Sequence, residues 1–180
     1  MTVPASTTAS STRALRPCEG ARRDPLGRVR QIPLPAEVRA LTTLSHVDYE
    51  DAFLVEVGAA QGRTGEQWAR VLFGRAPSLL RAKLWCTWCA LGLRLGPPRS
   101  RRFVLGWEVR RRAPDFVLLG AGSRIGMPAE LLLRRQRDEL LFATLVQKDG
   151  LLARVAWAAI EPLHLPVLRY LLERGSRPQR

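Results

Sequence analysis

The chain has 180 residues, which is enough for one domain with a substantial core and too few for two. Its net charge is +13, but apart from Lys83 and Lys148 the basic residues are arginines scattered along the sequence. Because basic motifs interleaved with aromatic residues are missing, no specific nucleic-acid binding is expected.

Neither a secreted nor a membrane-spanning protein is expected. Three cysteines provide no disulfide framework for a chain of this length. The first residues lack the apolar core of a secretory signal, and the longest uncharged run, residues 84–93, is about half of what a membrane span needs. The sequence therefore predicts a soluble protein in the reducing cytoplasm.

The first 45 residues differ in composition from the rest. Residues 2–12 are rich in Ser, Thr and Ala, and the stretch that follows scatters Arg, Pro and Gly. With few large apolar side chains, this segment cannot bury enough surface to offset the entropy of ordering it. We expect residues 1–45 to form a flexible or loosely docked tail, with residues 32–44 lying along the body, and residues 46–175 to form the domain.

The domain is expected to begin with a strand and a helix. Residues 46–57 alternate so that Phe53, Val55 and Val57 share one face. A helix opens at Thr64, which forms a capping box with Gln67, and ends at Gly74; Trp68, Val71 and Leu72 provide its buried stripe.

A second helix is expected to start at Pro77 and to end before Gly96. Its apolar residues recur at spacings of four and three residues, at Leu80, Leu84, Trp88 and Leu91. Cys86 and Cys89 lie within this helix, away from a helix N-terminus and without a second Cys or His pair. We expect both thiols to fill the core, and neither a metal site nor a redox pair.

Five strands and a closing helix are predicted for the rest of the chain. Short apolar runs joined by charged or Asp-Gly turns are typical of antiparallel hairpins. The expected strands are residues 103–110, 116–121, 129–137, 140–147 and 151–160. A final helix over residues 163–172 is expected to begin at Pro162. The predicted fold is α+β, in the order β-α-α-β-β-β-β-β-α, and such a curved sheet closed by a helix makes a concavity.

Alternation along two of these strands indicates which side chains face the concavity. Leu105 and Trp107 are expected to point inward from the first strand, and Val155 and Trp157 from the last. The two tryptophans are expected either to form an aromatic wall for a ligand or to fill the core.

Few polar side chains are placed to contact a ligand. His164 is a candidate acid/base group or ligand contact, and alternatively a residue bonded locally near Glu161. Tyr49 and Asp51 present a hydroxyl and a carboxylate at the cavity mouth, or else clamp and cap the end of the sheet. Arg124, in a loop at the expected entrance, pairs with a ligand carboxylate or is simply solvated.

Five blocks of sequence resemble a known superfamily. They are Asp48-Tyr49-x-Asp51-Ala52-Phe53, Leu105-Gly106-Trp107, Leu119-Gly120-Ala121-x-Ser123, Phe142-Ala143-Thr144-x-Val146 and Arg154-x-x-Trp157-x-x-Ile160-x-Pro162-x-His164. Over residues 46–175 the chain resembles an uncharacterised bacterial family of the START and Bet v 1-like (SRPBCC) superfamily. The resemblance implies a helix-grip fold, with a sheet wrapped around the last helix and an apolar cavity between them.

Members of that superfamily bind lipids, sterols, polyketides or hormones, and some catalyse ring closure or dehydration. The resemblance therefore implies binding of a hydrophobic small molecule, with a polyketide-like cyclase or dehydratase as the alternative. The cationic surface adds a third hypothesis, a protein that binds anionic membranes or nucleic acid. Fold alone does not choose among them. We expect no metal and no cofactor, and the sequence leaves homodimer formation open.

Overall fold

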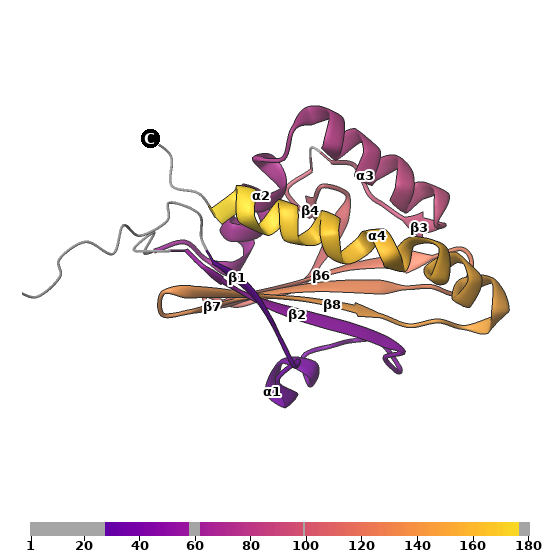
Figure 1. The fold of residues 1–180 in the computed structure, drawn as a ribbon, viewed down its shortest axis with the longest axis horizontal. Coiled ribbons are helices and arrows are strands. Elements are labelled where there is room, and N and C mark those ends of the chain that lie inside the picture. Colours follow the sequence, from indigo (N-terminus) through magenta and orange to yellow (C-terminus); the bar gives the residue numbers. More distant parts are fainter. Residues whose placement is uncertain (1–27, 58–61, 99, 177–180) are drawn as a thin grey trace, which may run out of the picture.

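The computed structural model describes residues 28–57, 62–98 and 100–176. The fold is α+β, with an antiparallel eight-stranded open sheet and a long C-terminal helix (Figure 1). The strands lie in the order β1-β2-β8-β7-β6-β5-β4, and β3 pairs with β6. Helices α2, α3 and α4 cover one face of the sheet and α1 lies on the other (Figure 1). The elements are β1 Val29–Ile32, α1 Ala36–Arg39, β2 Tyr49–Glu56, α2 Gly65–Gly74, α3 Ser78–Ala90, β3 Leu93–Arg94, β4 Phe103–Val104, β5 Trp107–Arg112, β6 Phe116–Ser123, β7 Ala129–Gln136, β8 Glu139–Val146 and α4 Gly150–Ser176.

Local signals place several of these elements where the sequence predicts them. The Thr64 side chain accepts from the backbone N–H of Gln67, and the Gln67 side chain accepts from the Thr64 N–H, so α2 starts with the predicted capping box. Strands β7 and β8 are joined at Arg137 and Asp138, with Gln136 opposite Glu139. Arg137 takes a positive φ of 24°, as a tight hairpin turn requires.

The predicted first strand of the meander, residues 103–110, is a hairpin instead. Leu105 and Gly106 have φ angles of 46° and 87°, which turn the chain between β4 and β5. A side chain on Gly106 would also collide with the Trp85 ring, so this position needs glycine for two reasons. Leu105 thus lies in a turn and does not alternate with Trp107 on one strand face.

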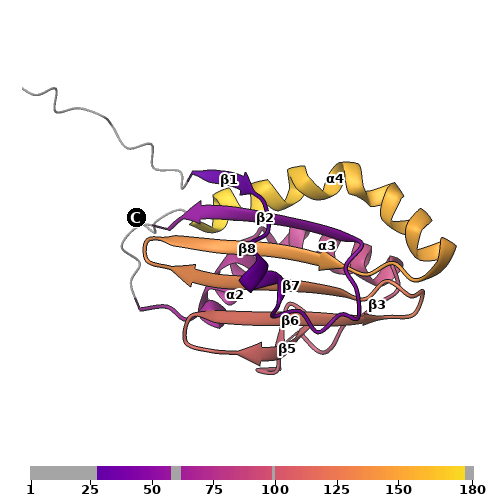
Figure 2. The same cartoon turned by 90° about the horizontal axis from the view of Figure 1, so that it is seen from below.

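The predicted fifth strand, residues 151–160, is wrong: it is the first part of α4, which runs from Gly150 to Ser176. Gly150 turns the chain with a φ of 82°, and the buried Ala153 and Trp157 are four residues apart, as helix geometry requires. Pro162 therefore lies inside the helix instead of opening it, and Pro166 follows one turn later. Neither proline can donate a backbone hydrogen bond, and α4 is bent as it passes along the sheet (Figure 2).

Both faces of the central strands are buried. On β2, Phe53 and Val55 belong to the core under the helices, whereas Ala52 and Leu54 belong to a second core on the outer face. The outer core is closed by Val38 of α1 and by partly buried apolar residues of the segment around it: Ile32, Leu34, Leu41, Leu44 and Val47. Residues 28–45, predicted as part of a tail, thus supply β1 and an outer layer. Residues 1–27 lie outside the described residues.

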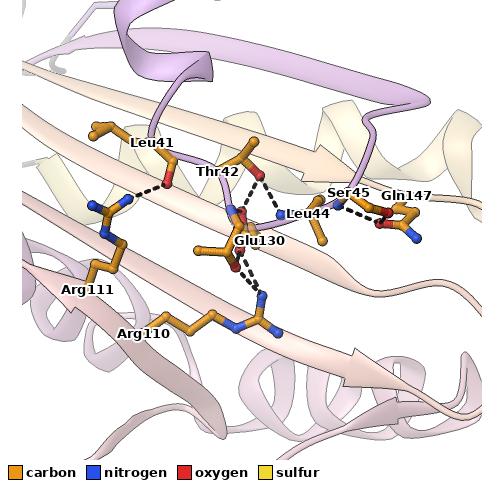
Figure 3. Close-up of polar contacts among 9 residues, drawn as sticks. Leu41, Thr42, Leu44, Ser45, Arg110, Arg111, Glu130 and Gln147 are labelled. Atoms are coloured by element: carbon orange, nitrogen blue, oxygen red, sulfur yellow. Dashed lines mark hydrogen bonds and ion pairs between the residues drawn. The ribbon is translucent and has the colours of Figure 1, made fainter.

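A buried carboxylate fastens this outer layer to the sheet (Figure 3). Glu130 of β7 is fully buried and accepts hydrogen bonds from the Thr42 hydroxyl at 2.5 Å and from the Thr43 N–H and hydroxyl. Arg110 of β5 reaches it with 2.7 Å between Nη1 and Oε1. The Arg110 side chain passes over Gly120 of β6, and a Cβ on Gly120 would lie 2.0 Å from Arg110 Nε. The absence of a side chain at Gly120 therefore leaves the space through which Arg110 reaches Glu130.

Candidate ligand-binding site

A cavity of about 270 Å³ lies between the inner face of the sheet and helices α3 and α4. That volume is far above the ~30 Å³ that one water molecule occupies in the liquid. Most of the side chains around it are apolar. Those lining it are Phe73, Leu80, Lys83, Leu84, Thr87, Trp88, Leu91, Leu93, Trp107, Met127, Ala129, Leu131, Phe142, Thr144, Val146, Trp157, Ile160, Leu163, His164, Val167, Leu168 and Leu171.

Helix α3 lines the cavity with its apolar stripe. All four members of the predicted stripe, Leu80, Leu84, Trp88 and Leu91, face the cavity and are only partly buried. None of the residues of α3 is fully buried, because this helix covers a hollow and not a packed core. Cys86 and Cys89 lie on its exposed side, so the prediction that they fill the core is wrong.

Two groups of aromatic rings contribute to the cavity wall, one from α3 and β5 and the other from α4. Trp88 of α3 packs edge-on against Trp107 of β5, with 5.3 Å between ring centroids. Trp157 of α4 packs against Tyr49 of β2 at 4.4 Å and against His164 at 5.3 Å. The predicted inward positions of Trp107 and Trp157 are therefore confirmed, although Trp157 comes from a helix and not from a strand.

A hydrogen-bonded trio ties α4 to the sheet at the edge of the cavity. Asp51 Oδ2 accepts from Tyr49 Oη at 3.0 Å and from His164 Nε2 at 2.8 Å. The Asp51 side chain is only 1 % exposed, while the His164 ring lines the cavity. Because Nε2 donates to the carboxylate, a neutral His164 keeps Nδ1 as an acceptor. Burial, followed by the negative charge of Asp51, raises the pKa of Tyr49, which therefore stays protonated as a donor.

Three polar atoms at the cavity wall are buried without a hydrogen-bond partner. They are the indole Nε1 atoms of Trp107 and Trp157 and the hydroxyl of Thr144, and all three residues line the cavity. A buried donor left without an acceptor costs about 1–3 kcal/mol. All three atoms have less than 1 Å² of accessible surface, so other atoms of these side chains form the cavity wall.

The remaining predicted site residues lie elsewhere. Val155 is 59 % exposed, so the prediction that it faces inward is wrong, because α4 turns it to the side opposite the sheet. Arg124 is exposed in the loop after β6, and Leu105 lies in the β4–β5 turn; neither lines the cavity. Tyr49 contacts Trp157 from behind the lining residues.

Sequence reasoning missed two polar residues of the cavity, Thr144 and Lys83. Thr144 follows Phe142 at alternate positions of β8 and shares its inward face, a pattern readable in the sequence. Lys83 directly precedes Leu84 of the α3 stripe and lies at the margin of that apolar face. Among the residues that the structure describes, no group of three or more His, Cys, Asp or Glu side chains is placed to hold a metal ion.

The length and composition of helix α4 are relevant to the expectation that no segment spans a membrane. Of the helices in the described part of the chain, it alone is long and apolar enough to do so by length and composition, and 17 % of its most apolar window is buried. One such helix is weak evidence for a membrane span. The expectation that the chain has no transmembrane segment is therefore not confirmed.

Compared with family models, with curated proteins and with solved structures, the chain matches none of them. The resemblance to START and Bet v 1-like proteins accordingly stays a prediction. The chemistry of the site is interpreted below from its own residues.

Proposed function

We propose that this protein binds a hydrophobic small molecule in the cavity between the sheet, α3 and α4. The observation that carries the proposal is a hollow of about 270 Å³ lined mainly by Leu, Val, Trp and Phe side chains. Ligand sites of this kind are largely apolar, with a few polar groups that fix orientation, and their volumes start near ~300 Å³. The proposed arrangement is a helix grip, in which α4 closes the concave face of the antiparallel sheet.

The shape of the opening supports a binding role. Leu163 of α4 lines the cavity and is nevertheless 67 % exposed, so the cavity reaches the surface beside this residue. Thr87 and Lys83 of α3 also line the cavity and are exposed. A passage between α3 and α4 gives a ligand access without unfolding of the sheet.

A pair of variants on α4 tests the proposal. Leu163→Asp places a carboxylate at the opening, whereas Leu151→Asp changes a residue that is 78 % exposed on the same helix but does not line the cavity. With the uncharged fluorescent probe N-phenyl-1-naphthylamine, we expect a saturable site in the wild type, loss of affinity in Leu163→Asp and unchanged affinity in Leu151→Asp. Absence of saturable binding in the wild type would refute the proposal.

The identity of a natural ligand is tested separately. The protein purified from its own cells under gentle conditions is expected to carry a lipid-like mass in native mass spectrometry. The Leu163→Asp variant, prepared in the same way, is expected to lose that mass, and Leu151→Asp to retain it.

The trio at the cavity edge favours a second candidate, an enzyme of the cyclase or dehydratase type. Asp51 orients the His164 ring through Nε2, which leaves Nδ1 to accept a proton from a bound substrate. If this is the function, His164→Ala abolishes turnover of a polyketide-like substrate and keeps affinity for it. Unchanged turnover would remove His164 from the mechanism.

A further inference from the structure

The charges around the cavity are of one sign. Lys83 carries the only full positive charge among the lining residues, and no Asp or Glu is among them. In the described part of the chain no ion pair engages the Lys83 ammonium, whereas ten other contacts between acidic and basic groups are formed. The net charge of +13 adds a field that attracts anions to this opening.

The interior of the cavity is apolar. The indole N–H groups of Trp107 and Trp157 and the Thr144 hydroxyl have almost no accessible surface, so the atoms that a ligand meets inside are mainly hydrocarbon. A ligand therefore needs an apolar body, with its charged group at the opening.

We propose that the ligand is a carboxylic acid with an apolar body. Its carboxylate would pair with Lys83 at the opening, and its hydrocarbon part would fill the cavity inside. A single lysine is a point charge of one unit, which matches a carboxylate better than a phosphate of nearly two negative charges. This inference rests on the proposed binding function and names the class of ligand for the same cavity.

The experiment compares decanoate with decanol, which share an apolar chain and differ in the head group. We expect the wild type to bind decanoate more tightly, and Lys83→Met to weaken decanoate by about two- to fivefold, as for an exposed ion pair. Decanol affinity is expected to stay unchanged in that variant. Lys148→Met is the matched control, because Lys148 is the chain's other lysine and does not line the cavity.

The Trp107 and Trp157 rings line the cavity and report binding of either probe through their fluorescence.

The outcomes separate the two proposals. If decanol and decanoate bind the wild type equally well, or if Lys83→Met and Lys148→Met behave alike, the acidic-ligand inference is overturned and the apolar cavity remains. If neither probe binds, the binding function itself fails.

Discussion

His164 Nε2 lies 2.8 Å from Asp51 Oδ2, and this contact joins the middle of α4 to strand β2 across 113 residues of sequence. The same carboxylate oxygen accepts from Tyr49, whose ring packs on Trp157, about two turns before His164 in α4. One buried carboxylate thereby fixes the position of the helix that closes the cavity. Four consequences of the structure can be measured.

The coupling of Asp51 and His164 is expected to appear in a double-mutant cycle. In Asp51→Ala, His164→Ala and the double variant, the sum of the two single losses in free energy of unfolding should differ from the double loss by about 0.5–3 kcal/mol. The reason is that both single changes remove the same hydrogen bond. Urea unfolding at neutral pH provides the measurement, and strictly additive losses would show that the contact contributes nothing.

Tyr49 is expected to make stability depend on alkaline pH. Its pKa is raised above the ordinary value of about 10, first by burial and then by the charge of Asp51. Above about pH 10 the unfolded chain loses this proton while the folded protein keeps it, so the stabilisation is complete below that pH and declines above it. Unfolding free energies from pH 8 upward should fall less steeply for Tyr49→Phe than for the wild type.

Tyr170, the other tyrosine of the chain, is exposed and provides the control for that series. Tyr170→Phe is expected to keep the pH dependence of the wild type. If Tyr49→Phe keeps it too, Tyr49 is not the group responsible.

Gly120 is expected to be required for the ion pair on the outer face. A methyl group there would displace Arg110 from Glu130, and the fully buried carboxylate would lose its charged partner. We expect Gly120→Ala to cost about 2–3 kcal/mol in free energy of unfolding. Gly122→Ala on the same strand has its nearest contact at 3.8 Å from Arg94 and is expected to be neutral or slightly stabilising. Equal effects of the two changes would contradict this role.

Val155 and Trp157 distinguish a helix from a strand in residues 151–160. In a strand both would share one buried face, whereas in α4 Val155 is exposed and Trp157 is buried. Trp157→Ala is therefore expected to cost about 3–5 kcal/mol, and Val155→Ala less than about 0.5 kcal/mol. Comparable losses for both, measured by chemical denaturation, would favour the strand.

The candidate site was predictable only in part. Trp107, Trp157 and His164 were identified from the sequence, because large aromatic and titratable residues in an apolar context are conspicuous. Lys83 was not, since a lone lysine on a helix usually points to solvent. Its place beside the cavity depends on how α3 lies over the sheet, and that is decided by packing between elements distant in the sequence.

The sequence by itself determined those elements whose cause is local: the capped start of α2 at Thr64, the β7–β8 turn at Arg137 and the strands whose ends are marked by turns. The tertiary structure alone decided the state of residues 151–160, because Ala153, Val155 and Trp157 fit a period of two as well as a helix. It also decided that residues 32–47 cover the outer face, since strands with apolar side chains on both faces need a second layer to exclude water. The trio of Tyr49, Asp51 and His164 exists only where β2 and α4 meet.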